Sequence, residues 1–187
     1  LDMYVITEDV SITDLSAELR SASILGPDSA STLRSLNIEP PDDGCVAMPR
    51  NDVYVMPTTL SATPGYDLFF DGAVGRDLLD EVLAAGAVRV ETPALQIARV
   101  AAGVPWFADD LSKDIIPLEA NLDEHVSTSK GCYPGQEVVA RILNLGQIAR
   151  RLMCLKAPGS HETAPGTELT SKEGKAAGVL TSIAYDP

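Results

Sequence analysis

The sequence predicts an α+β fold, in which a body of antiparallel strands and helices is followed by a smaller β unit. Helical patterns alternate with short β-rich segments, and the turns between them suit antiparallel connections. After residue 146 the pattern changes to short strands separated by turn residues. The chain has 187 residues, 45% of them hydrophobic, which is enough to bury a sizeable core.

The first half of the chain predicts strands interrupted by two helices. Apolar alternation or β-rich composition predicts strands at residues 10–16, 21–25, 45–48, 53–56, 66–70 and 88–90. The third and fourth of these strands flank a turn and should form a hairpin. Helices are expected at residues 28–36, with Leu33 and Leu36 inward, and 74–85, with residues 74, 78, 79, 82 and 83 inward and Gly86 at its end. Residues 1–6 resemble the end of a helix.

The second half begins with a predicted helix at residues 92–102. Thr92 suits its cap, Pro93 its first position and Gly103 its end. Residues 104–121 look irregular. A β unit follows, with strand patterns at 148–155, 167–170 and 177–184 and a hairpin turn at 172–175. We therefore expect a body over residues 1–145 and an incomplete β-barrel over residues 146–187.

Residues 130–141 hold the densest chemistry of the chain, reading Lys-Gly-Cys-Tyr-Pro-Gly-Gln-Glu-Val-Val-Ala-Arg. The pattern is a turn that leads into a short apolar helix. Pro134 suits the first helical position. Gln136 and Glu137 then lie in the first turn, where free N–H groups favour negative charge. Glu137 and Arg141 are four residues apart, so they share a helix face and suit an ion pair.

Cys132 has two interpretations. Close to a helix start and to Lys130, its thiolate would be favoured and its pKa depressed, which suits a redox, transfer or cluster-handling thiol. Alternatively, it is a small buried residue in a tight turn. For Tyr133 the alternatives are that the ring stacks on a ligand, that the hydroxyl makes a hydrogen bond, or that the side chain simply packs. Cys45 and Cys154 lack such a context and are expected in the core.

Charge is distributed unevenly along this chain of net charge −13. Residues 1–125 carry 22 acidic and 7 basic side chains, whereas residues 126–156 carry 1 acidic and 5 basic ones. This basic island is either a site for an anionic ligand or a solvated surface. The acidity elsewhere argues against non-specific binding of nucleic acid.

Other sequence features limit the location and cofactors. No apolar run approaches the ~20 residues of a membrane helix, and no secretory leader pattern is present. Three cysteines without metal-ligand spacing indicate a reducing compartment, so a cytoplasmic location is expected. Two histidines are too few for a histidine-rich metal site, and no metal is expected.

Several segments resemble the folate-binding YgfZ family, which is related to the glycine-cleavage T-protein (aminomethyltransferase). The eight residues 130–137 resemble its signature. Residues 116–122, Ile-Pro-Leu-Glu-Ala-Asn-Leu, are similar to the Pro-x-Glu segment upstream of that signature. Residues 97–105 resemble an Arg-x-Glu-Ala-Gly-x-Pro helix end, with Ala101 where Glu is common. Residues 65–68, Gly-Tyr-Asp-Leu, resemble the Gly-x-Glu strand that holds the pterin, with Asp in place of Glu.

The resemblance implies a folate site. Asp67 would accept hydrogen bonds from the pterin ring, and Arg99 would pair with a carboxylate or with the glutamyl tail. Without the resemblance, Asp67 would be interpreted as a strand terminus and Arg99 as a surface cation. The other expected folate-binding residues are Tyr66, Trp106, Tyr133, Gln136 and Arg141, with Trp106 alternatively a lid over the core. The expected catalytic residues are Cys132, Lys130 and Glu137.

The function implied by the resemblance is binding of tetrahydrofolate, or a one-carbon-substituted folate, in support of iron–sulfur cluster assembly or repair. Cluster-dependent tRNA-modifying enzymes would then depend on it. One alternative is an aminomethyltransferase that passes a one-carbon unit to tetrahydrofolate. That activity needs an aspartate from the family's N-terminal segment, which we expect to be missing here, as is the end of the C-terminal barrel. A nucleic-acid-binding module that uses the basic island is a third hypothesis, weakened because few aromatic residues interleave those cations.

Overall fold

The computed structural model describes residues 9–41, 47–50, 53–61, 63–146, 148–158 and 163–185. The chain divides into two compact units, Leu1–Val90 (unit 1) and Glu91–Pro187 (unit 2). Each unit has its own elements and is described by itself. The expected boundary between residues 145 and 146 differs from this division and stays a prediction.

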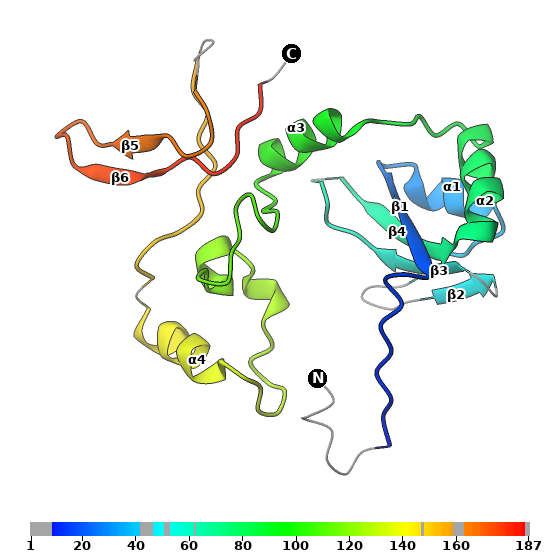
Figure 1. Ribbon diagram of the computed structural model, residues 1–187, viewed down its shortest axis with the longest axis horizontal. Helices are drawn as coiled ribbons and strands as arrows, with labels where there is room; N and C mark the ends of the chain where they lie inside the picture. The colour runs from blue at the N-terminus through cyan, green and yellow to red at the C-terminus, as the bar shows by residue number, and fades with distance from the viewer. Residues whose placement is uncertain are drawn as a thin grey trace. The chain divides into compact units, whose positions relative to one another are not determined.

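The described residues of unit 1 form a four-stranded antiparallel sheet and two helices (Figure 1). Its strands, in spatial order, are β1 (Leu19–Leu25), β4 (Gly65–Asp71), β3 (Val53–Pro57) and β2 (Ala47–Arg50). Its helices are α1 (Ser29–Ser35) and α2 (Gly72–Ala84). The Asp71 side chain accepts a hydrogen bond from the Ala73 N–H at 2.8 Å and so caps α2.

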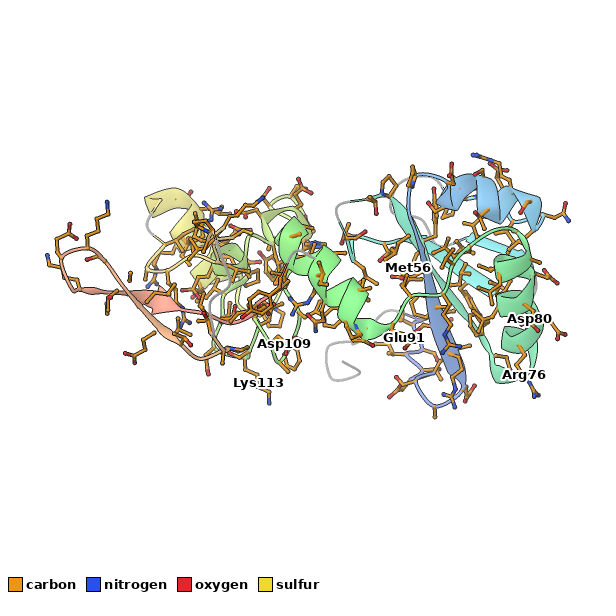
Figure 2. The ribbon with its side chains drawn as sticks, turned by 90° about the horizontal axis from the view of Figure 1, so that it is seen from above. Met56, Arg76, Asp80, Glu91, Asp109 and Lys113 are labelled. Carbon is orange, nitrogen blue, oxygen red and sulfur yellow. The ribbon has the colours of Figure 1, made fainter. Side chains whose placement is uncertain are left out.

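The two faces of this sheet differ in their neighbours. Because successive side chains of a strand point to opposite faces, one face presents the buried residues Ile24, Val53, Val55, Leu68 and Phe70. Leu33 of α1 and Leu78 and Val82 of α2 complete the core on that side. The other face, the open face, carries Ser23, Tyr54, Met56, Asp67 and Phe69 (Met56 is labelled in Figure 2). The core residues of both helices belong to the first face, so neither helix covers the open face.

Local patterns predicted most of unit 1. The strand at 21–25, the hairpin, the strand at 66–70 and both helices are confirmed, with ends shifted by a few residues, and Leu33 and Leu36 turn inward. In α2, however, Gly75, Leu78 and Val82 line the buried side, while Leu79 and Leu83 are exposed. The expected helix end at residues 1–6 and the core position of Cys45 lie outside the described residues.

Two predicted strands of unit 1 are wrong. Residues 10–15 have no regular structure, and Val10 and Ile12 are about half exposed. Val88 and Val90 lie in an irregular segment, exposed by 84% and 62%. Apolar alternation therefore occurs at both places without the neighbouring strand that a sheet requires.

Unit 2 has short helices and one small sheet. Its helices are α3 (Thr92–Ala102), η2 (Pro117–Ala120), η3 (Asp123–His125) and α4 (Gln136–Leu145). Strands β5 (Glu168–Thr170) and β6 (Ala176–Val179) form an antiparallel hairpin, drawn in orange and red in Figure 1. The predicted turn at 172–175 and the end of α3 at Gly103 are confirmed. The cap of α3 is Glu91 rather than Thr92, so Pro93 takes the second helical position.

The predicted strand at 148–155 is wrong. This segment has no strand and instead lies beside the η2 region. The Leu152 N–H donates to the Glu119 carbonyl at 2.7 Å, and the Asn121 side chain donates to the Leu152 carbonyl at 2.9 Å. Among the described residues of unit 2, β5 and β6 are the only paired strands, and they do not close a barrel.

Candidate functional site

Asp67 lies in the middle of the open face. In the sheet register it stands between Ser23 of β1 and Met56 of β3. The Ser23 hydroxyl donates to Asp67 Oδ1 at 2.5 Å, which places both side chains on the same face. Among the described residues, none donates a hydrogen bond to the other carboxylate oxygen, Oδ2. A partly exposed carboxylate with one oxygen held and one available is suited to accept hydrogen bonds from a ligand.

Tyr66 does not share this face with Asp67. It packs, partly buried, against the core cluster on the helix-covered side. Neighbouring residues of a strand point to opposite sides, so the structure does not bring Tyr66 and Asp67 together on one face, and a folate-binding role of Tyr66 stays a prediction. Ser23 was not expected at the site, because its place depends on strand register rather than on any local motif.

The residues Cys132 to Gln136 build a tight turn at the start of α4. Gly135 has φ 86° and ψ −1°, and the Gln136 N–H donates to the Tyr133 carbonyl at 3.2 Å. With Pro134 second and Gly135 third, this is a type II turn. Pro134 therefore precedes the helix instead of beginning it, whereas Gln136 and Glu137 lie in the first helical turn as predicted.

The Gln136 side chain fixes the turn from both ends. Its Oε1 accepts from the Tyr133 N–H at 3.1 Å, and its Nε2 lies 3.9 Å from Cys132 Sγ. The Lys130 ammonium lies 5.0 Å from the centre of the Tyr133 ring. Cys132 is exposed, which supports an accessible thiol and contradicts a buried one. Gln136 thus orients the thiol, a role that its predicted place in a folate site did not include.

Glu137 and Arg141 lie on the solvent side of α4. Both are exposed, whereas Val139 between them is buried to 7% exposure. The two charged residues are therefore accessible to a partner or ligand.

Arg99 lies at the centre of a buried polar cluster, with only 2% of its surface exposed. All five of its N–H groups are hydrogen bonded. They donate to the Gln96 side chain, the Val104 carbonyl, the Asp109 and Asp110 carboxylates and the Ser182 hydroxyl, at 2.6–3.3 Å. The guanidinium also lies 4.7 Å from the Trp106 ring centre. A ligand would have to displace one of these partners to reach Arg99, and the interpretation as a surface cation is wrong.

Asp110 receives four hydrogen bonds in this cluster. Oδ2 accepts from Arg99 and from the Trp106 N–H, and Oδ1 accepts from the hydroxyls of Thr181 and Ser182. Burial by itself raises the pKa of Asp110, but these hydrogen bonds outweigh it and hold the pKa below its ordinary value. The cluster thus joins the C-terminal segment of unit 2 to α3.

The basic island is partly neutralised within the protein. Arg150 pairs with the buried carboxylate of Glu119 at 3.1 Å. Arg151 donates to Asn121 at 2.6 Å and lies 3.7 Å from Asp123. These contacts fasten the segment after α4 to the η2 and η3 region. Nearby Cys154 is exposed, with its sulfur 3.7 Å from the Val100 carbonyl, so its predicted core position is wrong.

Within the described ranges, no three His, Cys, Asp or Glu side chains gather in a way that could hold a metal ion. Among the same residues, no helix combines the length and apolar character required to cross a membrane.

The fold matches that of the glycine-cleavage T-protein. Aminomethyltransferase T of Bartonella henselae superposes with a TM-score of 0.66 at 22% identity, covering 88% of this chain and 47% of that one. No family model matches the sequence. The structural class defined by these findings is therefore a T-protein-like α+β chain.

Sequence relatives fall into the same group. A chloroplastic protein of Arabidopsis thaliana, named as a candidate transferase, is 30% identical over 97% of this chain and 43% of its own length. An aminomethyltransferase of Herpetosiphon aurantiacus is 26% identical over 97% of this chain and 52% of its own length. A tRNA-modifying protein YgfZ of Sodalis glossinidius is 34% identical over 53% of this chain and 31% of its own length. The chain is therefore similar, over nearly its whole length, to aminomethyltransferases and, over about half of it, to a YgfZ protein. It spans about half the length of these relatives or less.

Proposed function

We propose that this chain binds tetrahydrofolate, or a one-carbon-substituted folate, and supports iron–sulfur cluster assembly or repair as a YgfZ-type protein. The observation that carries the folate part is the carboxylate of Asp67 on a sheet face that neither helix of unit 1 covers, in a chain related to both aminomethyltransferases and YgfZ. The finer iron–sulfur role rests on the exposed Cys132 thiol in the signature turn.

The residues of the open face fit a reduced pterin. The pyrimidine half of such a ring system is flat and presents an amino group and a ring N–H group, which need an acceptor. Asp67 Oδ2 is an available acceptor, and Ser23 holds the other oxygen in place. When bound, the folate would supply a carrier for one-carbon units. The protein's own contribution is to orient the ring through a charge-assisted hydrogen bond.

Unit 2 supplies the candidate thiol. The Gln136 Nε2 lies 3.9 Å from the sulfur, and the Lys130 ammonium lies 5.0 Å from the centre of the adjacent Tyr133 ring. An accessible thiol close to the start of a helix suits transfer or redox chemistry on a client protein. Tyr133 of this turn and the exposed Glu137 and Arg141 of α4 remain proposed contact residues. Trp106, whose ring centre lies 4.7 Å from the Arg99 guanidinium, is a further proposed contact residue. We propose a cytoplasmic location from the cysteine usage; one relative is chloroplastic.

Folate binding is tested by calorimetric titration of the chain with 5-formyltetrahydrofolate, a stable reduced folate. We expect saturable binding of one molecule per chain. The fragment p-aminobenzoylglutamate, which has the tail without the pterin, should bind far more weakly. An absence of heat change with 5-formyltetrahydrofolate at millimolar concentration contradicts the proposal.

The thiol role needs a separate experiment. Cells lacking their own YgfZ-type protein should regain cluster-dependent tRNA modification with the wild-type chain and lose it with Cys132→Ala. Cys154→Ala is the matched control, since this second exposed thiol lies outside the signature turn. If Cys132→Ala supports modification as well as wild type does, the thiol has no part in the function.

Aminomethyl transfer is the second candidate, because several relatives are named aminomethyltransferases. It shares the folate site and differs in needing an aspartate from outside the matched segment. Release of tetrahydrofolate-bound one-carbon product from a carrier-bound aminomethyl group would favour it. A nucleic-acid-binding role is less well supported, since Arg150 and Arg151 already have acidic or amide partners in the protein.

A further inference from the structure

The open face of unit 1 carries a pair of aromatic residues beside Asp67. Tyr54 of β3 and Phe69 of β4 stand directly opposite each other in the register, and both are partly exposed. Met56, 37% exposed, stands opposite Asp67. Directly opposed side chains lie within contact distance on one face, so this face holds an aromatic pair and a carboxylate in adjacent rows.

The spacing of these rows matches a flat heterocycle. Residues two apart on a strand lie ~6.5 Å from each other on the same face, comparable to the length of two fused six-membered rings. A ring lying on Tyr54 and Phe69 would therefore bring its edge to Asp67. Its donor groups would meet Oδ2, the oxygen that Ser23 leaves available.

We propose that Tyr54 and Phe69 form the stacking surface for the pterin ring of a reduced folate whose donor edge is bound by Asp67. This inference rests on the proposed function and adds the residues that select for a flat ring. Charge complementarity supports this occupant. A second copy placed symmetrically on the same face would bury both Asp67 carboxylates in a desolvated interface without supplying a cation from this face, which is unfavourable.

The test uses Tyr54→Leu and Phe69→Leu, which keep apolar bulk and remove the aromatic ring. Each should weaken binding of 5-formyltetrahydrofolate by about 3- to 10-fold in calorimetry, because an aromatic contact is lost. Phe107→Leu is the matched control, since Phe107 is a 72% exposed aromatic residue in unit 2, and its affinity should equal that of wild type. Circular dichroism and the urea unfolding midpoint establish that each variant is folded.

The outcomes separate this inference from the proposed function. If wild type binds and both leucine variants bind equally well, the stacking surface is refuted while the folate proposal stands. If wild type does not bind, both fail. If sedimentation shows a wild-type dimer that Tyr54→Leu or Phe69→Leu dissociates, the face is an interface between copies and the inference is overturned.

Discussion

At the residue scale, Arg99 is the side chain whose surroundings differ most from expectation. A guanidinium is buried at acceptable cost only when its charge is paired and its donors are satisfied. Here Asp109 and Asp110 pair the charge, and five acceptors satisfy the donors. The partners come from α3, from the loop that follows it and from Ser182. Arg99 therefore acts first as an anchor for unit 2.

Arg99→Met should lower the free energy of unfolding of unit 2 by about 3–5 kcal/mol, because it leaves the Asp110 carboxylate buried without its cation. Urea unfolding followed by circular dichroism measures this. Arg34→Met removes an ion pair whose partners are both mostly exposed and should cost about 1 kcal/mol or less. If Arg99→Met and Arg34→Met lose similar amounts of unfolding free energy, the buried cluster stabilises the protein no more than an exposed ion pair does.

Asp110 gives a prediction for acid stability. Its folded pKa lies below its unfolded value, so the carboxylate adds stability above the unfolded pKa of about 4. That contribution is lost as the pH falls from there through the folded pKa. Asp110→Asn should therefore make unfolding of unit 2 less dependent on pH below about 4, although the variant is less stable at neutral pH. Asp80→Asn on α2 is the control. If the unfolding free energy of Asp110→Asn depends on pH below about 4 as strongly as that of the control, the prediction is wrong.

At the element scale, α2 depends on a glycine that faces the sheet. A Cβ at Gly75 would lie 2.4 Å from the Phe70 ring, whereas a Cβ at Gly72 would meet nothing within 4 Å. Gly75→Ala should destabilise unit 1 by about 1–3 kcal/mol through overpacking. Gly72→Ala, in the same helix, should be neutral or slightly stabilising. Equal unfolding midpoints for the two variants would contradict the close packing of α2 on β4.

The start of α4 depends on the left-handed conformation of Gly135. Gly135→Ala should cost about 1–2 kcal/mol locally and speed amide exchange in the first turn of α4, measured by hydrogen-exchange mass spectrometry. Gly131→Ala is the control, because a Cβ there meets nothing within 4 Å and its φ is not positive. Unchanged protection in both variants would mean that the type II turn does not hold the helix start.

Elements set by local sequence were predictable, and those set by distant partners were not. The Pro-Gly-Gln turn, the hairpin around residues 172–175 and the glycine end of α3 each follow from residues next to one another. The apolar pattern of residues 148–155 suited the predicted strand. In the structure, however, the backbone of Leu152 hydrogen bonds to Glu119 and Asn121 instead of to a neighbouring strand. The hydrogen bond between Ser23 and Asp67 depends on the register of β1 and β4, which a local sequence pattern does not predict.

At the scale of the whole molecule, the candidate residues divide between the two units. Asp67 and Tyr66 belong to unit 1, and the other expected site residues belong to unit 2. Within unit 2 the structure brings Lys130, Cys132, Tyr133 and Gln136 together in one turn, and it brings Arg99 and Trp106 together in another cluster. The family likeness extends over both units, because the matched relatives cover nearly the whole chain.

The most direct test of the central claim, that Asp67 binds a reduced folate, is a calorimetric titration of Asp67→Asn with 5-formyltetrahydrofolate. The matched control is Asp80→Asn, an exposed carboxylate on α2 (Figure 2). We predict that Asp67→Asn binds about 10- to 100-fold more weakly than wild type, because a charge-assisted hydrogen bond is lost, while Asp80→Asn binds normally. Equal affinities for wild type and Asp67→Asn would contradict the account.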